Sequence, residues 1–492
     1  MEDVWHSRLF NVHAWSEHKA VMELTEYIFR SLDEEQQKTI RGRANNRGKT
    51  DLYKHLRIVL TDLYVGWKTD PTLCTALSFN RNDYRVGSRY NGLHISHRVT
   101  DVCHILEDQG YIRISKGGYD RVGDGRSNRT ARLFLTDRLK TLFSEVGLES
   151  WQINQHQDQE CIILRNKDID SRKAKDIPYE ETDQTTAMRM EVNALNELLS
   201  QHYVDITFLR RPFILRTQQQ GNVRNPELIP VDQGQKFMRR IFSRSRWDCD
   251  GRWYGGFWQS ARKGSRRHIR IDNEITDEVD FDGLHPALLA ARHGVVSEGD
   301  KYDLKEHICE EVSQFVQRDT VKKLVLVAIN AKDRSSAFRA FRLKFDNYSN
   351  KTLSRLLDAF IDRHPYLNDE LCSDQGIHLM HTDSLITTHI INEFVAAKKP
   401  ILPIHDSYIV KSKERLFLDQ AMSKATIAVV GTDLTRTSRI NEEDRLFELD
   451  RNYRASEDYD PMYGFEDYLE PLIEDVSEEY LKRYEQWLAK KS

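Results

Sequence analysis

The chain of 492 residues is poor in proline, with 11, and its six cysteines are scattered and contain no C-x-x-C pair. This cysteine pattern argues against a disulfide framework or a cysteine-based zinc site, and it is typical of reduced thiols in a cytosol. No apolar run approaches the roughly 20 residues needed to span a bilayer, and no basic region followed by an apolar stretch opens the chain. We therefore expect an ordered, helix-rich, cytoplasmic protein with no membrane partner.

A large excess of one charge is also missing. The 73 Lys+Arg and 77 Asp+Glu give a net charge of −4, which argues against a wholly basic nucleic-acid binder. The balance is uneven along the chain, because residues 441–492 hold 16 acidic and 7 basic groups, whereas residues 1–440 hold 61 acidic and 66 basic groups. The aromatic residues of this tail predict a C-terminal helix pair that docks on the rest of the protein. A bolder hypothesis is that the tail covers a basic cleft when substrate is absent.

Residues 95–135 combine a helical pattern with a basic hairpin. The apolar spacing predicts a helix that ends at Gly110, and two strand-like stretches then flank a glycine-rich basic turn. This order resembles a winged helix, which sets its helix in a groove of duplex nucleic acid and its hairpin tip on phosphates. The candidate contacts are Arg98, Lys116, Arg121 and Arg126. A winged helix that serves only as a spacer or a protein contact is the alternative.

Residues 239–270 form a basic and aromatic run, with ten Lys/Arg against two Asp and with Trp, Tyr and Phe interleaved. Guanidinium groups bind phosphates and aromatic faces stack bases, so the run predicts contact with nucleic acid or nucleotide. The basic candidates are Arg239, Arg240, Arg262, Arg266 and Arg267. A solvated basic surface over an aromatic cluster is the plainer interpretation.

Two further segments place a carboxylate at the end of a strand. In residues 278–286, Val279 and Phe281 alternate with acids, so Asp280 lies on one face of a strand that Gly283 ends. In residues 401–410, two apolar strands flank a polar tip that contains Asp406, and such a tip needs a strong partner, for which a divalent cation is the obvious choice. An ordinary strand exit and a turn whose amides satisfy the aspartate are the alternatives.

Residues 318–331 predict a helix with one distinctive row. Arg318, Lys322, Leu326 and Asn330 recur every fourth residue, so two cations and an amide share a row roughly 18 Å long on an otherwise apolar helix. Such a row suits a nucleoside triphosphate. Two metals held by the distant carboxylates would then stabilise attack of a 3′-hydroxyl on an α-phosphate, and the helix could protonate pyrophosphate. An amphipathic core helix with two surface cations is the alternative.

In their order these segments resemble the phage-type single-subunit RNA polymerases and the related family A DNA polymerases. The segment 248–254 is similar to D-x-x-G-R-x-Y, the Asp280 segment to motif A, the row from Arg318 to motif B, and His405-Asp406-Ser407 to motif C. The segment that begins at His381 also looks familial. The chain also resembles a group of uncharacterised bacterial and prophage proteins that carry the same G-R-x-Y, motif A and His-Asp-Ser segments. The resemblance covers residues 239–411, about a third of the chain.

The resemblance implies an α+β right-hand polymerase, with palm and fingers behind an N-terminal winged-helix domain. Asp280 and Asp406 would bind Mg²⁺ or Mn²⁺, and Lys322 would act with them in catalysis. The implied contacts to nucleoside triphosphate, template or primer are Arg318, Asn330, His285, Arg252, Tyr254, His405 and His381.

The same resemblance divides the chain into four parts. Residues 1–145 would be a helical segment plus the winged helix, residues 146–238 a linker and helical thumb-like region, residues 239–440 the palm with compact fingers, and residues 441–492 the acidic helical tail. Within the second part, the glutamines and prolines of residues 217–235 predict a loop.

Two departures from the family pattern concern the sugar. Asn330 stands where the RNA polymerases have a sugar-sensing Tyr, and His285 stands where family A DNA polymerases have a Glu that excludes ribose. The G-R-x-Y and His-Asp-Ser forms favour RNA synthesis, as by an RNA polymerase or primase. The alternatives are a compact DNA polymerase of a mobile element or prophage, a template-independent nucleotide-adding defence enzyme, and a non-catalytic winged-helix DNA-binding protein.

Overall fold

The computed structural model describes residues 3–41, 52–122, 125–149, 152, 159–166, 174–220, 223–295, 300–345, 347–439 and 476–491. These residues form a mixed α+β structure whose sheets have two to four strands, so the predicted α+β class is confirmed. Across these ranges, no helix is both long enough and apolar enough to cross a membrane.

The described residues up to 149, here the N-terminal module, have their own hydrophobic core. In α3 (Tyr53–Thr69), buried leucines and a valine at helical spacing, such as Leu56, Leu60 and Leu63, form the face that packs into this core. The sheet of the module has the strand order β1-β2-β6-β3. Its other elements outside residues 95–135 are β1 (Ser7–Leu9), α1 (Lys19–Arg30), α2 (Glu34–Arg41), β2 (Cys74–Leu77) and α5 (Asp137–Val146).

The helix and hairpin predicted within residues 95–135 are present in that order. The helix is α4 (Val99–Asp108), and Gly110 follows it with a φ of +70°, a conformation that glycine adopts without strain. The strands β3 (Ile112–Ser115) and β6 (Ala131–Leu135) pair antiparallel, and β4 (Gly118–Val122) and β5 (Gly125–Arg129) lengthen the hairpin. The winged-helix name stays a prediction.

A second hydrophobic core joins residues from Cys161 to Leu434. It includes side chains from both sides of the predicted boundary at 238, so that boundary does not separate two cores, and the four-part division of the chain stays a prediction. The first elements around this core are β7 (Ile162–Leu164), α6 (Asp183–Ser200), β8 (Val204–Ile206), β11 (Met238–Phe242), β12 (Asp250–Gly255), α7 (Lys263–Arg266) and β13 (Ile269–Ile271).

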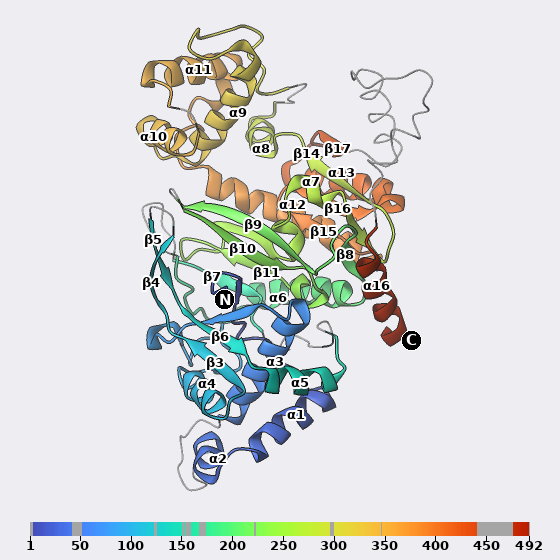
Figure 1. The fold of residues 1–492 in the computed structure, drawn as a ribbon. Helices are drawn as coiled ribbons and strands as arrows, with labels where there is room; N and C mark the ends of the chain where they lie inside the picture. Colours follow the sequence, from blue (N-terminus) through green and yellow to red (C-terminus); the bar gives the residue numbers. More distant parts are fainter. Residues whose placement is uncertain are drawn as a thin grey trace, which may run out of the picture.

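The four-stranded sheet of this half has the order β15-β16-β14-β17. Helix α13 packs on β14 and β16, and the long helix α12 packs on β12 (Figure 1). These elements are β14 (Thr276–Phe281), α8 (Leu284–Arg292), α12 (Gly376–Ala396), β15 (Leu402–Ile404), β16 (Ser407–Lys411), α13 (Arg415–Val430) and β17 (Arg436–Arg439).

Three helices gather in a lobe at the top of Figure 1, namely α9 (Gln314–Asn330), α10 (Arg334–Lys344) and α11 (Asn350–Arg363). The C-terminal helix α16 (Glu478–Lys491) docks instead beside β8, where Tyr480 and Trp487 pack against Tyr203. This agrees with the predicted docked helix. The acidic residues 441–475, which the bolder hypothesis needs, lie outside the described residues.

The loop predicted over residues 217–235 is wrong for most of its length. Strands β9 (Phe213–Gln220) and β10 (Val223–Pro230) form an antiparallel hairpin in regular register. Each strand has only the other as a neighbour, so each has an open edge on which a proline costs no ladder hydrogen bond. The prolines that suggested a loop are therefore compatible with a strand.

Candidate active site

Strand β14 brings Asp280 to the point where the chain leaves the sheet. Val279 and Phe281 are each 3% exposed, so Asp280 between them lies on the opposite, partly exposed face. Gly283 follows with a φ of +55° and begins α8, and a Cβ there would lie 3.2 Å from the hydroxyl of Tyr302. The strand thus ends in an abrupt turn that suits glycine, directly after the carboxylate.

The hairpin predicted over residues 401–410 is present as β15 and β16. Ile404 pairs with Ser407, which leaves His405 and Asp406 as the two residues of the turn. Both strands are fully buried and the turn is partly exposed. His405 has a φ of +55°, a left-handed conformation that histidine adopts at a tight turn. The structure therefore buries the two strands and leaves Asp406 at a half-open tip.

The two aspartates meet because β14 and β16 are paired. Asp280 lies opposite Ser407 in the antiparallel register, and the amide of Phe281 donates a hydrogen bond of 3.2 Å to the carbonyl of Asp406. Asp280 and Asp406 therefore occupy adjoining positions on neighbouring strands. The sheet thus brings together two residues that the sequence analysis selected from distant segments.

Arg252 of β12 stands behind this pair and binds two other buried groups. Its Nε donates to Asp383 of α12 at 2.6 Å, and another guanidinium nitrogen lies 2.9 Å from Nε2 of His285. Burial raises the pKa of Asp383 to about 7, while Arg252 opposes the rise and Asp406 adds to it. Burial and then Arg252 lower the pKa of His285 to about 3, so His285 is a neutral acceptor for Arg252 at neutral pH.

Tyr254, two residues further along β12, contacts the tip of the hairpin. Its ring meets the ring of His405 edge to face at 5.4 Å, and its hydroxyl donates to Asp250 at 3.2 Å. Burial and then Arg252 lower the pKa of His405 to about 4, so this imidazole is also neutral at pH 7. Alternate residues of β12 thus support both Asp383 and the turn that carries Asp406.

Helix α9 exposes the row that the sequence predicts. Arg318, Lys322, Leu326 and Asn330 are all exposed, whereas the intervening apolar residues are mostly buried. Arg318 pairs with Asp300, and the ammonium of Lys322 lies 5.8 Å from the ring centre of Tyr302. Asn330 instead donates to the carbonyl of Leu326 and lies directly against Gly376 at the start of α12. Lys322 therefore lies near Tyr302, and Asn330 contacts α12.

Three residues near the aspartates were not selected from the sequence. Asp383 lies in an apolar helix and is buried. A carboxylate in such a helix needs a partner, and this is the signal by which the sequence could have identified it. Glu278 binds both Arg266 and the hydroxyl of Ser407. Tyr302 is 5% exposed, and its pKa is raised to about 12 by burial first, with further contributions from Asp300 and Asp406. Nothing in its local sequence pattern singled it out.

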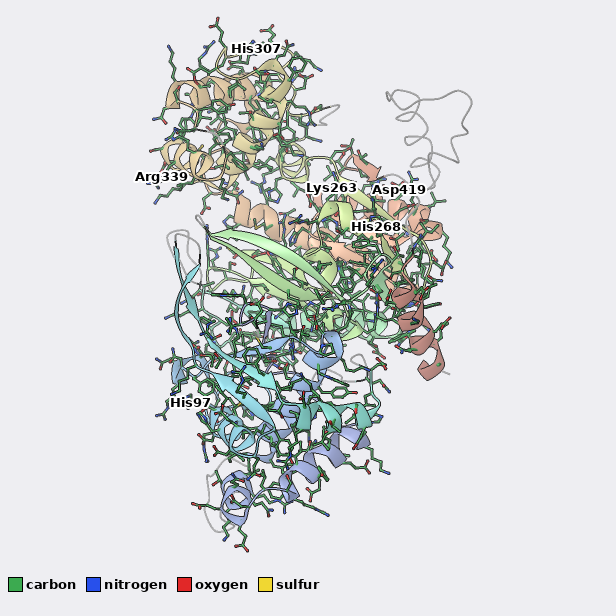
Figure 2. All side chains as sticks on the ribbon, viewed as in Figure 1. His97, Lys263, His268, His307, Arg339 and Asp419 are labelled. Carbon is green, nitrogen blue, oxygen red and sulfur yellow. The ribbon has the colours of Figure 1, made fainter. Side chains whose placement is uncertain are left out.

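The predicted nucleic-acid contacts fall into two groups, one in each half of the molecule. Arg98 begins α4 and pairs with Asp101 at 3.0 Å, and Lys116 is exposed before β4. Arg121 and Arg126 face each other across β4 and β5, and their side chains lie outside the described residues. Figure 2 labels His97, the neighbour of Arg98, and Lys263, the neighbour of Arg262 in the second group.

The second group is divided by burial. Arg262 and Arg267 are exposed, and Arg239 is partly buried. Arg266 is largely buried and forms a two-bonded ion pair with Glu278.

Arg240 and His381 lie away from the open surface. Arg240 is 3% exposed and donates to the carbonyl of Gly251 and the hydroxyl of Ser384, and its contact with nucleic acid stays a prediction. His381 lies with Arg240 in a cavity of about 310 Å³ between α6 and α12, and neither Asp280 nor Asp406 lines this cavity.

The donor set at the paired strands fits a shared divalent cation. Mg²⁺ ordinarily takes one or two protein carboxylates and completes its shell with water and phosphate oxygens. Asp280 and Asp406 supply two carboxylates at adjoining positions. In the part of the chain that the structure describes, no group of three or more His, Cys, Asp or Glu side chains is arranged to hold a metal. Two carboxylates would leave the rest of the shell of such a cation to water or to phosphate oxygens.

No family model matches the chain, and no curated protein matches it. Among solved structures, the POL domain of Pol1 from M. smegmatis, in complex with DNA primer-template and dNTP, is similar at 12% identity with a TM-score of 0.28. The match covers 52% of this chain and 50% of that chain, so this chain spans about half the length of that neighbour. Similarity at this level carries no argument, and the function has to be inferred from the residues of the site.

Proposed function

We propose that this protein is a template-directed nucleic-acid polymerase that adds nucleotides to a 3′-hydroxyl. The observation that carries the proposal is the pairing of β14 with β16, which brings Asp280 and Asp406 to adjoining positions where the two strands end. Two carboxylates from separate strands, together with an exposed row of cations on α9, supply the metal ligands and the phosphate-binding groups that nucleotidyl transfer requires.

In this proposal Asp280 and Asp406 hold Mg²⁺ or Mn²⁺ together with the substrate phosphates. The cations would lower the barrier to attack by the 3′-hydroxyl on the α-phosphate. Arg318 and Lys322 bind the triphosphate from the exposed face of α9, and Lys322 supplies a proton to the departing pyrophosphate. Asn330 holds α9 against the start of α12 and thereby fixes the position of the exposed row of α9 relative to α12.

Arg252 acts as a positioning residue in the same proposal. Its ion pair with Asp383 and its hydrogen bond to His285 fix the guanidinium behind the aspartates. From there its positive charge offsets part of the repulsion between the two carboxylates before any cation is bound. Tyr254 supports His405, which we assign to the neighbourhood of the primer end.

The proposal favours RNA synthesis, and synthesis of DNA is the alternative. His285 lies beside Arg252, where a glutamate would bring a further carboxylate to the site. We expect His285→Glu to shift the ratio of dNTP to NTP incorporation towards dNTP, with His285→Gln as the uncharged control. An unchanged ratio in the glutamate variant would show that His285 does not contact the sugar.

We also propose that the N-terminal module is a winged helix that binds duplex nucleic acid. The order of α4 and the β3–β6 hairpin supports this assignment. Replacing Arg98 and Lys116 together by alanine should weaken duplex binding and leave extension of a saturating primed template intact. Equal duplex affinity in the double variant would instead favour a module that serves as a spacer.

The polymerase proposal is tested with purified full-length protein, Mg²⁺ or Mn²⁺, and a labelled primer. Four reactions suffice, with NTPs or dNTPs and with or without a template. We expect template-dependent extension by the wild type and a loss of at least about 1,000-fold in Asp280→Asn and Asp406→Asn. Asp369→Asn, an exposed aspartate remote from the paired strands, is the matched control and should extend normally.

The outcomes separate the functions that the sequence left open. Extension without template would favour the nucleotide-adding defence enzyme. No product with either nucleotide set and either cation, from a protein that still binds nucleic acid, would leave the non-catalytic binding protein. Extension that survives Asp406→Asn would refute the assignment of the metal ligands.

A further inference from the structure

A cleft of about 800 Å³ separates the N-terminal module from the polymerase-like half. One wall is the segment that begins with β1 and includes Leu9 and Asn11. The other wall is formed by residues of β10, β11 and β12 and by the turn after β12, and it includes Arg239 and Tyr254. The volume lies in the range of roughly 300–1,000 Å³ that is usual for small-ligand sites.

The cleft is electropositive. Among the described residues that line it there is no Asp or Glu, whereas Arg8 and Arg239 both contribute. Arg8 is already paired with buried Asp62 at 2.8 Å. Arg239 is partly buried, and the nearest carboxylate that acts on its charge, Asp176, is committed to Arg165 at 2.7 Å.

Arg239 thus has the environment of an anion-binding guanidinium group. The described residues offer it no ion pair within 4 Å and no side-chain hydrogen bond. Burial lowers its pKa, and the like charge of Arg165 acts in the same direction. A partly buried cation without a partner is costly, and a phosphate oxygen that accepts two N–H bonds is the ligand that relieves the cost best.

An aromatic ring and bare backbone lie beside this cation. Arg239 and Tyr254 are cross-strand partners in the register of β11 and β12. The cleft continues over Gly255 and Gly256, two residues whose positive φ values and close neighbours leave no space for a side chain. A flat base can therefore approach the backbone next to Tyr254 while its phosphate reaches Arg239.

We propose that this cleft binds a phosphate-bearing nucleotide unit of a single-stranded nucleic acid, with Arg239 on the phosphate and Tyr254 beside the base. The N-terminal module then forms one wall of the strand path. That the bound strand is the one being extended rests on the proposed function, because Tyr254 contacts His405 at the catalytic turn. The preference for a phosphate does not depend on that function.

A strand fits the site better than a free nucleotide does. A second cavity, of about 600 Å³, lies against Leu9, Phe10 and Val12, which also line the first. The two cavities therefore share one wall of the N-terminal module, and a chain of nucleotides can follow that wall from one cavity to the other. A free nucleotide would occupy only one of them.

The test measures binding of labelled oligothymidylate by fluorescence anisotropy, with ATP as a free-nucleotide probe in parallel. Full-length protein is used in EDTA, so that binding through a divalent cation does not contribute. Arg239→Gln should weaken oligothymidylate binding about tenfold and reduce the salt dependence of log Kd by about 0.7. Arg339→Gln, an exposed arginine of α10 labelled in Figure 2, is the matched control and should bind as the wild type does.

A second pair of variants tests the opposite wall without touching a buried group. Leu9 is 78% exposed, so Leu9→Glu puts a negative charge at the cleft with little risk to folding, and Leu9→Gln is its neutral match. Leu9→Glu should bind oligothymidylate several-fold more weakly than Leu9→Gln. The Asp406→Asn variant should bind as the wild type does in EDTA even though it lacks synthesis, which separates this inference from the proposed function.

Oligothymidylate binding that depends on Arg239, with ATP binding at least tenfold weaker, supports the strand. Equal dependence for ATP would overturn the strand in favour of a free-nucleotide site. If Arg239→Gln and Leu9→Glu both bind both probes as well as their controls do, the cleft binds no phosphate and the inference is wrong.

Discussion

At the scale of single residues, the site depends on one buried ion pair. The side chain of Asp383 is 0% exposed and that of Arg252 is 14% exposed, and their 2.6 Å contact is a direct link between α12 and β12. A buried carboxylate loses most of its hydration, so its charge is tolerated only while the guanidinium is present. Arg252 is therefore both a structural residue and a source of positive potential at Asp406.

The first prediction concerns this pair. Arg252→Met should lower the free energy of unfolding by about 3–5 kcal/mol, because it leaves Asp383 buried and unpaired. Asp383→Asn should cost less, and the double variant should be more stable than the sum of the two losses predicts. Urea unfolding followed by fluorescence measures all four proteins. Because burial raises the pKa of Asp383 to about 7, the loss in Arg252→Met should shrink as the pH falls and the carboxyl takes a proton. Strict additivity would contradict the coupling.

The second prediction concerns His285, whose pKa burial and Arg252 lower from 6.5 to about 3. Between these values the unfolded chain binds a proton that the folded protein excludes, so stability falls as the pH falls. One such proton gives a slope of about 1.4 kcal/mol per pH unit. His285→Gln should reduce the loss of stability between pH values of about 5.5 and 4.5 by roughly this amount, as measured by urea unfolding at each pH. Parallel losses in the two proteins would mean that His285 titrates alike in both states.

At the scale of elements, the segments with a regular apolar period were predicted well. The alternation around Asp280 gave β14, the two apolar runs around Asp406 gave β15 and β16, and the four-residue row gave α9. The β9–β10 hairpin was missed, because glutamine and proline are poor strand formers and only the pairing of the two strands overrides that preference. The alternation of buried and exposed residues in a segment can be predicted from its own sequence, whereas the strand with which it pairs cannot.

The third prediction concerns the C-terminal helix α16. Arg483 binds Asp205 of β8 at 2.8 Å, and the carboxylate of Asp205 is 2% exposed. Arg483→Ala should therefore lower the free energy of unfolding by about 3 kcal/mol. Lys482→Ala, which removes only an exposed helix pair with Glu478, should cost less than about 0.5 kcal/mol and is the control. Thermal unfolding followed by circular dichroism compares them, and equal losses would mean that α16 docks by its aromatic residues alone.

At the scale of the whole molecule, the structure divides the acidic tail. The docked helix belongs to residues 476–492, which carry 3 acidic and 4 basic groups, whereas residues 441–475 carry 13 acidic and 3 basic groups. The negative charge of the tail is therefore separate from the part that packs on the protein. Removing residues 441–492 as one piece would mix an electrostatic effect with the loss of α16.

The fourth prediction uses this division. If the tail screens a basic surface, replacing the acids of residues 441–475 by their amides should tighten single-strand binding and steepen its salt dependence, with α16 retained. Fluorescence anisotropy over a salt series measures both effects. The control carries the same number of amide substitutions at exposed acids elsewhere in the described residues, such as Glu34, Glu35 and Asp137. Unchanged affinity in the tail variant would leave the charge division without a role in binding.

Side-chain type and apolar period are local properties, so the residues alone predicted which groups carry chemistry and which elements hold them. They pointed to Asp280 and Asp406 and assigned each to the end of a buried strand. Three features came from the folded chain: the pairing of these strands, the approach of Asp383 and Tyr302, and the burial of Arg240 next to an Arg239 that faces a cleft. Adjacent residues of one strand have opposite surroundings, because successive side chains point to opposite faces of a sheet and the fold covers those faces unequally.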